Sequence, residues 1–221
     1  LTFYLAENSP FRSYLDVIPK IDSGDCTTTD FFSPEELDML RVPSVQSETK
    51  ARAEALQTHY GGAERSFTLD EARWAAWVVV SRVLQVQNGL GQPTTLLIPF
   101  LDMLNHSPTK GSSQILSGRA EPGGRMKIIA GGNIKAGEQV FIQYGGGTIG
   151  SERFIQDYGF LDPKGARQWD RDHVQRLDDE ARASLLLTSL EEDYAALASG
   201  DLSVHEQLAL GFRINLKEAM K

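Results

Sequence analysis

Two short segments carry residue types that could hold a polar ligand and act on it. Residues 97–107 read Leu-Ile-Pro-Phe-Leu-Asp-Met-Leu-Asn-His-Ser, and Tyr144 follows His106 by 38 residues. An apolar strand that runs into Asp102, Asn105 and His106 is expected to be buried, and buried polar groups need hydrogen-bond partners. Asn and neutral His offer donors and acceptors that match the edge of a heterocycle such as adenine. The alternative is that Asn-His-Ser-Pro only ends a strand, because Asn, Ser and Pro favour turns.

The second segment is a predicted strand over residues 138–144, which places Tyr144 at its end. Residues 145–147 are three glycines, which permit unusual dihedrals and the close approach of a ligand, but could equally form a loose loop. Tyr158 lies downstream in Gln-Asp-Tyr-Gly-Phe. The alternative for both tyrosines is a core position with one satisfied hydroxyl group.

The motifs resemble those of the SET-domain methyltransferases, in the branch that includes the plant Rubisco large-subunit lysine methyltransferase and the actin-histidine methyltransferase. They occur in the order of that family and touch most of residues 1–163. They are Ile-Pro-Phe-Leu-Asp-Met-Leu-Asn-His-Ser (98–107), Gly-Glu-Gln-Val-Phe-Ile-Gln-Tyr (137–144), Asp-Tyr-Gly-Phe-Leu (157–161), and two segments similar to the helical insert of that branch, 11–20 and 73–82.

The resemblance implies a cofactor, S-adenosylmethionine, and roles for six residues. The cofactor-binding residues would be Arg82, Asp102, Asn105 and His106, and the catalytic residues would be Tyr144 and Tyr158. Tyr144 matches the catalytic tyrosine of the family, and Tyr158 matches an aromatic residue near the substrate channel. Before the resemblance is considered, Arg82 could instead form an internal ion pair with an acidic side chain.

Methyl transfer from a sulfonium ion suits these residue types. The main requirement is an uncharged nucleophile held close to the methyl carbon. An aromatic channel beside a positive charge favours neutral lysine, since desolvation and like charge both lower its pKa. A tyrosine hydroxyl can orient the amine, and the tyrosine ring attracts positive charge, so no dedicated base is required.

The resemblance therefore implies a protein-lysine N-methyltransferase whose partner is a lysine-containing protein substrate. A protein histidine is the alternative acceptor. The histidine-modifying relative holds the imidazole with an asparagine two residues after the matching arginine, where this chain has Leu84. A third interpretation is a non-catalytic SET-like module that binds protein partners, although Asn105, His106 and Tyr144 together argue against it.

Composition agrees with an intracellular globular enzyme. Of the 221 residues, 41% are hydrophobic, and no apolar run approaches the length of a membrane span. The net charge of -8 argues against nucleic-acid binding. The single cysteine, Cys26, excludes an internal disulfide and a cysteine-cluster zinc site, so no metal is expected. We expect a monomer in the chloroplast, the cytoplasm or the nucleus.

Local signals predict an α+β chain in which a helical block precedes short strands. Capping boxes at Ser33 and Thr68 predict helix starts, the second for a buried helix over residues 72–84, and residues 85–95 are predicted to form a loop. Strands are predicted over residues 95–103, 125–130 and 138–144. The resemblance refines this class to the SET fold, in which small curved sheets surround a pseudoknot.

The C-terminal region is predicted to be helical from about residue 165. Capping boxes at Ser189 and Ser203 predict two helix starts, and Gly200 is placed to stop the helix between them. Helical spacing predicts a core face made of Leu208, Phe212, Leu216 and Ala219. Three other histidines lie on polar stretches and are predicted to be solvated: His59, His173 and His205.

The predicted domains are a SET domain over residues 1–163 and a partial helical substrate-binding lobe over residues 164–221. The helical insert is expected over about residues 1–94, and the C-terminal SET half over about 95–163. The first strand pair of the family has no counterpart and the C-terminal helical lobe is cut short, so we expect the sequence to be truncated at its N-terminus and at its C-terminus.

Overall fold

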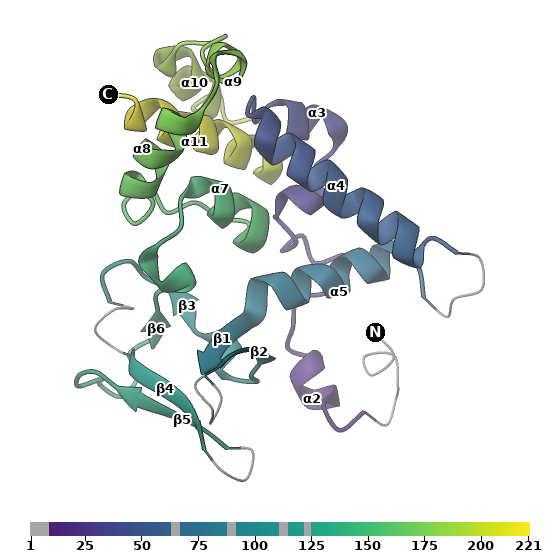
Figure 1. Ribbon diagram of the computed structural model, residues 1–221, viewed down its shortest axis with the longest axis vertical. Helices are drawn as coiled ribbons and strands as arrows, with labels where there is room; N and C mark the ends of the chain where they lie inside the picture. The colour runs from purple at the N-terminus through teal and green to yellow at the C-terminus, as the bar shows by residue number, and fades with distance from the viewer. Residues whose placement is uncertain (1–8, 63–66, 88–91, 111–114, 122–124) are drawn as a thin grey trace. The chain divides into compact units, whose positions relative to one another are not determined.

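The computed structural model describes residues 9–62, 67–87, 92–110, 115–121 and 125–221 (Figure 1). It divides into two compact units. The first unit comprises Leu1–Val80 with Ile149–Lys221, and the second comprises Ser81–Thr148. Each unit is described by itself below.

Helices and helical turns form the regular structure in the described part of the first unit. They are α2 (Arg12–Leu15), η1 (Thr29–Phe31), α3 (Pro34–Asp38), α4 (Pro43–Tyr60), α5 (Leu69–Arg82), α7 (Ser151–Arg153), η4 (Phe154–Tyr158), α8 (Arg167–Arg176), α9 (Asp179–Leu185), α10 (Leu190–Leu197) and α11 (Val204–Ala219). The last two residues of α5, Ser81 and Arg82, are counted in the second unit.

Among its described residues, the second unit has three two-stranded sheets and two helical turns. Its elements are β1 (Val83–Gln87), β2 (Pro93–Leu97), η2 (Leu101–Met103), β3 (Asn105–His106), β4 (Ile115–Glu121), β5 (Arg125–Ala130), β6 (Phe141–Ile142) and η3 (Tyr144–Gly147). The sheets pair β1 with β2, β3 with β6, and β4 with β5. The α+β class is therefore confirmed, and β5 coincides with the predicted strand over residues 125–130.

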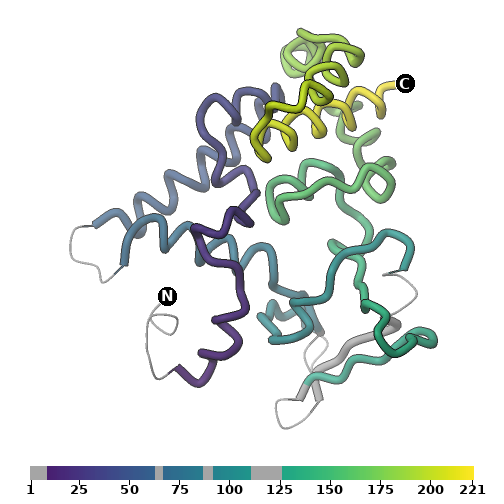
Figure 2. Tube along the Cα trace, turned by 180° about the vertical axis from the view of Figure 1, so that it is seen from behind, coloured from purple at the N-terminus to yellow at the C-terminus, as the bar shows by residue number. Residues whose placement is uncertain are grey.

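The core of the first unit is built around α11, which lies against α10 and α8 (Figures 1 and 2). One cluster of buried apolar side chains comprises Leu37, Leu40, Val42, Val45, Ile155, Val174, Leu185, Ala209, Phe212, Leu216 and Ala219. The predicted core face of α11 is confirmed, because Phe212, Leu216 and Ala219 belong to this cluster and Leu208 packs against it, partly buried.

Local capping explains where several helices begin. Ser33, Ser189 and Ser203 each accept a hydrogen bond from the backbone N–H three residues on, and the glutamate there accepts one from the serine N–H. Thr68 exchanges the same pair of bonds with the glutamate three residues on. The four predicted capping boxes are confirmed. Gly200 has a left-handed φ of 81°, which suits a residue placed to end a helix.

The hairpin of β1 and β2 corrects two predictions. Helix α5 ends at Arg82, earlier than predicted, and the chain continues directly into β1. The predicted loop over residues 85–95 is therefore wrong at both ends, where Gln87 of β1 pairs with Pro93 of β2. Its central residues, 88–91, lie outside the described residues. Proline takes the first position of a strand without losing a ladder hydrogen bond, so Pro93 was a poor loop signal.

The strands predicted over residues 95–103 and 138–144 are both shorter in the structure. Strand β2 ends at Leu97, and Phe100 has a left-handed φ of 71°, which a strand cannot contain. The second strand is confined to Phe141–Ile142. The expected burial is also wrong for β2, since Leu97 at its end is 37% exposed.

Two of the three histidines predicted to be solvated are less exposed than expected. His173 is 8% exposed, and its Nδ1 lies 2.5 Å from Glu152 Oε2, so it is not a solvated group. His205 is partly buried, and its Nδ1 lies 3.0 Å from Glu36 Oε2. Only His59 is exposed as predicted. The partners of the other two come from distant elements, which local polarity cannot reveal.

In the described part of the chain, no helix combines the length and the apolar character needed to cross a membrane. The predicted domain boundary between residues 163 and 164 stays a prediction.

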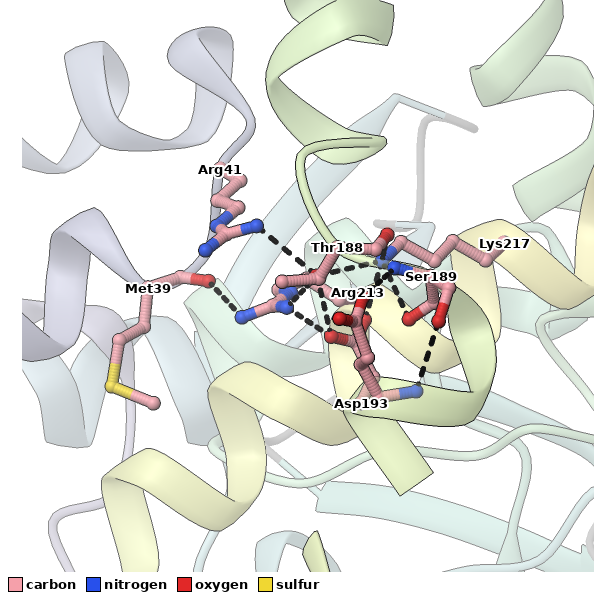
Figure 3. A network of polar contacts seen from close by, with 8 residues as sticks. Met39, Arg41, Thr188, Ser189, Asp193, Arg213 and Lys217 are labelled. Atoms are coloured by element: carbon pink, nitrogen blue, oxygen red, sulfur yellow. Dashed lines mark hydrogen bonds and ion pairs between the residues drawn. The ribbon is translucent and has the colours of Figure 1, made fainter. Parts of the chain in front are cut away.

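A buried charge cluster joins α10 to α11 (Figure 3). Asp193 is 1% exposed and binds two cations, with Lys217 Nζ 2.6 Å from its Oδ2 and Arg213 on its other oxygen. Thr188 Oγ1 donates to Asp193 Oδ1 at 2.7 Å and accepts from Arg41 at 3.1 Å. Because Arg213 and Lys217 are each 4% exposed, one carboxylate compensates two buried cations. The docking of the last helix therefore depends on Asp193.

Asp193→Asn tests this cluster. Asn keeps the size of the side chain but removes the charge that compensates Arg213 and Lys217, so we expect the free energy of unfolding to fall by about 3 kcal/mol. Glu191→Gln, at an exposed position of the same helix, is the matched control and should change it by less than about 0.5 kcal/mol. Urea denaturation followed by circular dichroism measures both. Equal midpoints for the two variants would contradict the role of Asp193.

Candidate active site

Two segments that are far apart in the sequence meet in a short parallel sheet of the second unit. In this sheet β3 pairs with β6, and the register places Asn105 opposite Phe141 and His106 opposite Ile142. The Ser107 N–H extends the pairing by donating to the Ile142 carbonyl at 3.1 Å. The predicted asparagine-histidine segment therefore lies beside the segment that leads into the predicted catalytic tyrosine.

The Tyr144 hydroxyl is held by the backbone of the neighbouring segment. It donates a hydrogen bond of 2.9 Å to the Leu104 carbonyl oxygen. Burial raises the pKa of the Tyr144 phenol, the Arg82 charge acts in the opposite direction, and the Asp102 charge adds to the rise. The phenol is therefore neutral at physiological pH, and it can orient a polar group but cannot act as a base.

His106 fixes the backbone of the same tyrosine. The Tyr144 N–H donates to His106 Nδ1 at 3.0 Å, and the two ring centroids are 5.3 Å apart. Because Nδ1 accepts this bond, the ring carries its proton on Nε2. His106 therefore positions Tyr144, in addition to the cofactor role that the sequence predicts for it.

Arg82 and Asp102 form a buried ion pair whose two charges both act on the Tyr144 phenol. Arg82 Nη1 lies 3.6 Å from Asp102 Oδ2, and it donates to the Asp102 carbonyl at 3.2 Å and to Met103 Sδ at 3.5 Å. The Asp102 side chain is fully buried, and that of Arg82 is 16% exposed. The internal ion pair considered from sequence is thus present, and its acidic partner is itself a predicted site residue.

Two of these residues have capacity left for a ligand. Arg82 Nε is buried, and no described residue forms a hydrogen bond with it. The contact of 3.6 Å between Arg82 and Asp102 is too long for a strong hydrogen bond. Asn105 is exposed, so its carboxamide does not sit at a buried strand end as predicted. A ligand with an anionic group and a hydrogen-bonding edge fits these donors and acceptors.

The glycines after Tyr144 take the dihedrals that the sequence suggested. Gly145, Gly146 and Gly147 have φ values of 57°, 62° and 73°, in the left-handed region that residues with a side chain rarely adopt. The Thr148 N–H and hydroxyl both donate to the Gly145 carbonyl, at 3.1 Å and 2.8 Å. The run therefore forms a tight turn directly after the tyrosine.

Tyr158 belongs to the first unit, where it ends η4. The residue is partly buried, and its ring lies 6.1 Å from that of Phe154 and 6.2 Å from that of Phe160, centroid to centroid. It therefore sits in an aromatic cluster, as a channel residue would. Its predicted catalytic role stays a prediction.

Sequence reasoning missed three features of this site. It gave no role to the Leu104 carbonyl or the Met103 sulfur, and no sequence signal points to a particular backbone oxygen. It also did not pair Arg82 with Asp102, although the opposite charges of two predicted site residues were a usable signal. Among the described residues, no group of three His, Cys, Asp or Glu side chains is placed to hold a metal ion.

No protein-family model matches the chain, but curated relatives do. The chain is 27% identical over 179 residues to the ribulose-1,5 bisphosphate carboxylase/oxygenase large subunit N-methyltransferase of Nicotiana tabacum, covering 73% of this chain and 35% of the relative. It is 31% identical over 170 residues to the actin-histidine N-methyltransferase of Gallus gallus, covering 70% and 27%. It is 29% identical over 173 residues to the fructose-bisphosphate aldolase-lysine N-methyltransferase of Arabidopsis thaliana, covering 71% and 34%. The chain thus spans 27% to 35% of the length of these relatives.

Solved structures match a larger share of this chain than the curated relatives do. The SET domain of LSMT bound to MeLysine and AdoHcy matches with a TM-score of 0.72 at 16% identity, covering 99% of this chain and 70% of that one. Rubisco LSMT bound to AdoMet matches with a TM-score of 0.69 at 16% identity and the same coverage. The chain therefore has the fold of the SET domain. The sequence resemblance to this branch of methyltransferases is confirmed.

Asp102→Asn tests the buried ion pair. The change leaves Arg82 buried without its counter-charge, so we expect the free energy of unfolding to fall by about 3 kcal/mol. Glu138→Gln is the control, because Glu138 pairs with Lys110 at 3.6 Å at the surface of the same unit and should contribute less than about 1 kcal/mol. Thermal unfolding of the three proteins gives the comparison. A stability loss no larger than that of the control would show that Arg82 does not need Asp102.

Proposed function

We propose that this chain, which has the SET fold and is related to protein methyltransferases, is the methyl-transferring part of an S-adenosylmethionine-dependent protein-lysine N-methyltransferase. One observation carries the proposal. The neutral hydroxyl of Tyr144 is anchored to the Leu104 carbonyl directly beside Asn105 and His106, in the only parallel strand pair among the described residues. The sequence matched both segments to the cofactor and catalytic motifs of the family.

The cofactor would be held by Arg82, Asp102, Asn105 and His106. When bound, S-adenosylmethionine supplies a methyl group on a positively charged sulfur atom. The spare Nε donor of Arg82 suits its carboxylate, and the exposed carboxamide of Asn105 suits the edge of its adenine. Asp102 keeps the Arg82 guanidinium in place from behind.

Tyr144 would orient the amine of the substrate. Its hydroxyl proton is donated to Leu104, and a phenol oxygen in this arrangement is the acceptor that we propose for a hydrogen bond from the lysine amine. Because its pKa is raised, the phenol stays neutral and adds no negative charge that would hold the lysine in its protonated form. The tyrosine therefore positions the nucleophile without acting as its base. Tyr158, in its aromatic cluster, would line the substrate channel.

The partner would be a protein that presents a lysine side chain. The net charge of -8 favours a basic partner weakly. The helices over residues 164–221 would form the start of a substrate-binding lobe. Two relatives are named as chloroplastic enzymes that act on Rubisco and aldolase. We therefore take these two proteins as the first acceptors to test, and the chloroplast as the first compartment to examine for a monomeric enzyme.

A protein histidine is the second candidate acceptor, since the Gallus gallus relative is named an actin-histidine N-methyltransferase. An imidazole acceptor needs a polar partner that fixes its tautomer. Leu84 of β1, opposite Leu96, supplies no such group where the histidine-modifying branch has asparagine. Lysine is therefore preferred. Mass spectrometry of methylated acceptors separates the two, and methyl-histidine as the sole product would reverse this preference.

Tyr144→Phe should lower methyl transfer while leaving cofactor binding unchanged. Loss of an orienting hydroxyl is expected to reduce the rate on the order of 10²-fold. Tyr194→Phe is the matched control, because Tyr194 is 49% exposed and lies in the first unit. The measurement follows transfer of a labelled methyl group to Rubisco and aldolase. A Tyr144→Phe rate close to that of Tyr194→Phe would remove the catalytic role from Tyr144.

Asn105→Ala should weaken binding of S-adenosylmethionine about tenfold, the expected loss for one well-placed hydrogen-bonding group. Asn133→Ala, at an exposed position of the same unit, is the control and should leave affinity unchanged. Calorimetric titration with the cofactor and its demethylated product measures both. If the affinity is unchanged, Asn105 does not bind the cofactor, and Asn-His-Ser-Pro only ends a strand. Absence of binding by the folded parent chain would favour the non-catalytic module.

A further inference from the structure

We propose that Arg52 and Thr27 are positioning residues that fix the place of Tyr158. Arg52 lies in α4 and Thr27 lies two residues before η1, and they bind the residues on either side of the tyrosine. All of these residues belong to the first unit. The consequence for catalysis rests on the proposed function, in which Tyr158 lines the substrate channel.

The turn that carries Tyr158 is an unusual piece of backbone. η4 is a π-helical turn, in which the Gly159 N–H donates to the Phe154 carbonyl, five residues earlier, at 2.9 Å. Turns of this kind are rare and occur frequently at functional sites. Gly159, which closes the turn, has a left-handed φ of 74°. Contacts from other elements are therefore expected to hold the turn in place.

Arg52 holds the residues before Tyr158. Its Nη2 donates to Asp157 Oδ1 at 2.8 Å, and its Nη1 donates to the Gln156 carbonyl at 3.3 Å. Gln156 is 0% exposed, and the side chains of Arg52 and Asp157 are 25% and 20% exposed. A planar guanidinium binds two acceptors in a fixed geometry, so it ties the Asp157 side chain to the backbone of the preceding residue.

The charges around Arg52 keep its guanidinium in this position. Nη2 also donates to Glu48 Oε1 at 2.8 Å, and Nη1 lies 3.6 Å from Asp30 Oδ2. Arg153 Nη1 lies 2.8 Å from the same Glu48 oxygen and 3.9 Å from Asp157 Oδ2. Three carboxylates thus share two arginines. If Arg52 turned away, partly buried carboxylates would lose their counter-charge, which is costly.

Thr27 holds the residue after Tyr158. Its hydroxyl donates to the Gly159 carbonyl at 2.8 Å. The two segments are so close that a Cβ atom at Gly159 would lie 2.4 Å from Thr27 Oγ1. Thr27 is 132 positions from Gly159 in the sequence, and Arg52 is 105 positions from Asp157. Two distant segments therefore hold the backbone on both sides of the tyrosine.

Arg52→Lys and Thr27→Val test this role kinetically in the whole chain. Lysine keeps the positive charge but lacks the planar fork, and valine lacks the hydroxyl donor. We expect kcat for methyl transfer to Rubisco and aldolase to fall at least about fivefold in each variant, because a displaced channel residue misplaces the amine. KM for the acceptor and the affinity for S-adenosylmethionine should each change less than about twofold.

Arg12→Lys and Thr49→Val are the matched controls. Arg12 forms an exposed ion pair of 3.0 Å in α2. Thr49 is 5% exposed, and its hydroxyl bonds the Thr29 hydroxyl and the Val45 carbonyl. Thr49→Val should lower the melting temperature at least as much as Thr27→Val, because its hydroxyl is deeply buried. Both controls should nevertheless keep kcat within about twofold of the parent.

Hydrogen exchange of the Gly159 amide tests the same contacts without any activity. We expect exchange to be at least about fivefold faster in Arg52→Lys and Thr27→Val, and unchanged in both controls, because the bond to Phe154 opens more often. If the parent chain transfers no methyl group, the proposed function fails, and exchange alone decides whether Arg52 and Thr27 hold the turn. The inference is overturned if exchange is unchanged, or if an active parent gives test variants with the kcat of the controls.

Discussion

The candidate site depends on one short piece of parallel sheet. Two residue pairs between β3 and β6 join residues that are 36 positions apart in the sequence, and the bond from the Tyr144 N–H to His106 Nδ1 continues that pairing beyond the strands. The tyrosine hydroxyl then reaches back to the Leu104 carbonyl. His106 thus fixes the backbone of Tyr144, and Leu104, two residues earlier in the same segment, fixes its side chain. A reaction that depends on the orientation of its nucleophile requires such a rigid hydroxyl group.

Charge is arranged around this tyrosine so that the phenol remains neutral. Burial raises the pKa of Tyr144, and the influences of Arg82 and Asp102 oppose one another, because the two side chains form an ion pair. A phenolate would attract a protonated lysine and make the loss of its proton harder. The buried pair therefore places two opposing charges near the hydroxyl, and burial remains the first cause of the raised pKa of Tyr144.

The sequence predicted what is decided locally. The capping boxes at Ser33, Thr68, Ser189 and Ser203 are complete within four residues, and each begins a helix where expected. Strand limits failed because they depend on partners and on single dihedrals, such as the left-handed φ of Phe100. Motif resemblance named Arg82, Asp102, Asn105, His106 and Tyr144 as site residues, and their roles stay predictions. Their mutual contacts could not be predicted, because a carbonyl acceptor leaves no mark in the sequence.

The buried charges of the two units differ in a way that bears on their use. Lys217 approaches Asp193 to 2.6 Å and also donates to the Thr188 carbonyl at 2.6 Å, so its ammonium group is closely enclosed by the protein. The contacts of Arg82 with Asp102 and Met103 all involve Nη1, at 3.2 Å or more, and its Nε has no hydrogen-bond partner among the described residues. Desolvation of a cation is costly unless its donors are satisfied. Arg213, in the same cluster as Lys217, also leaves its Nε without a hydrogen-bond partner among the described residues, so the long contacts of Arg82 through Nη1, rather than its open Nε, distinguish the two sites.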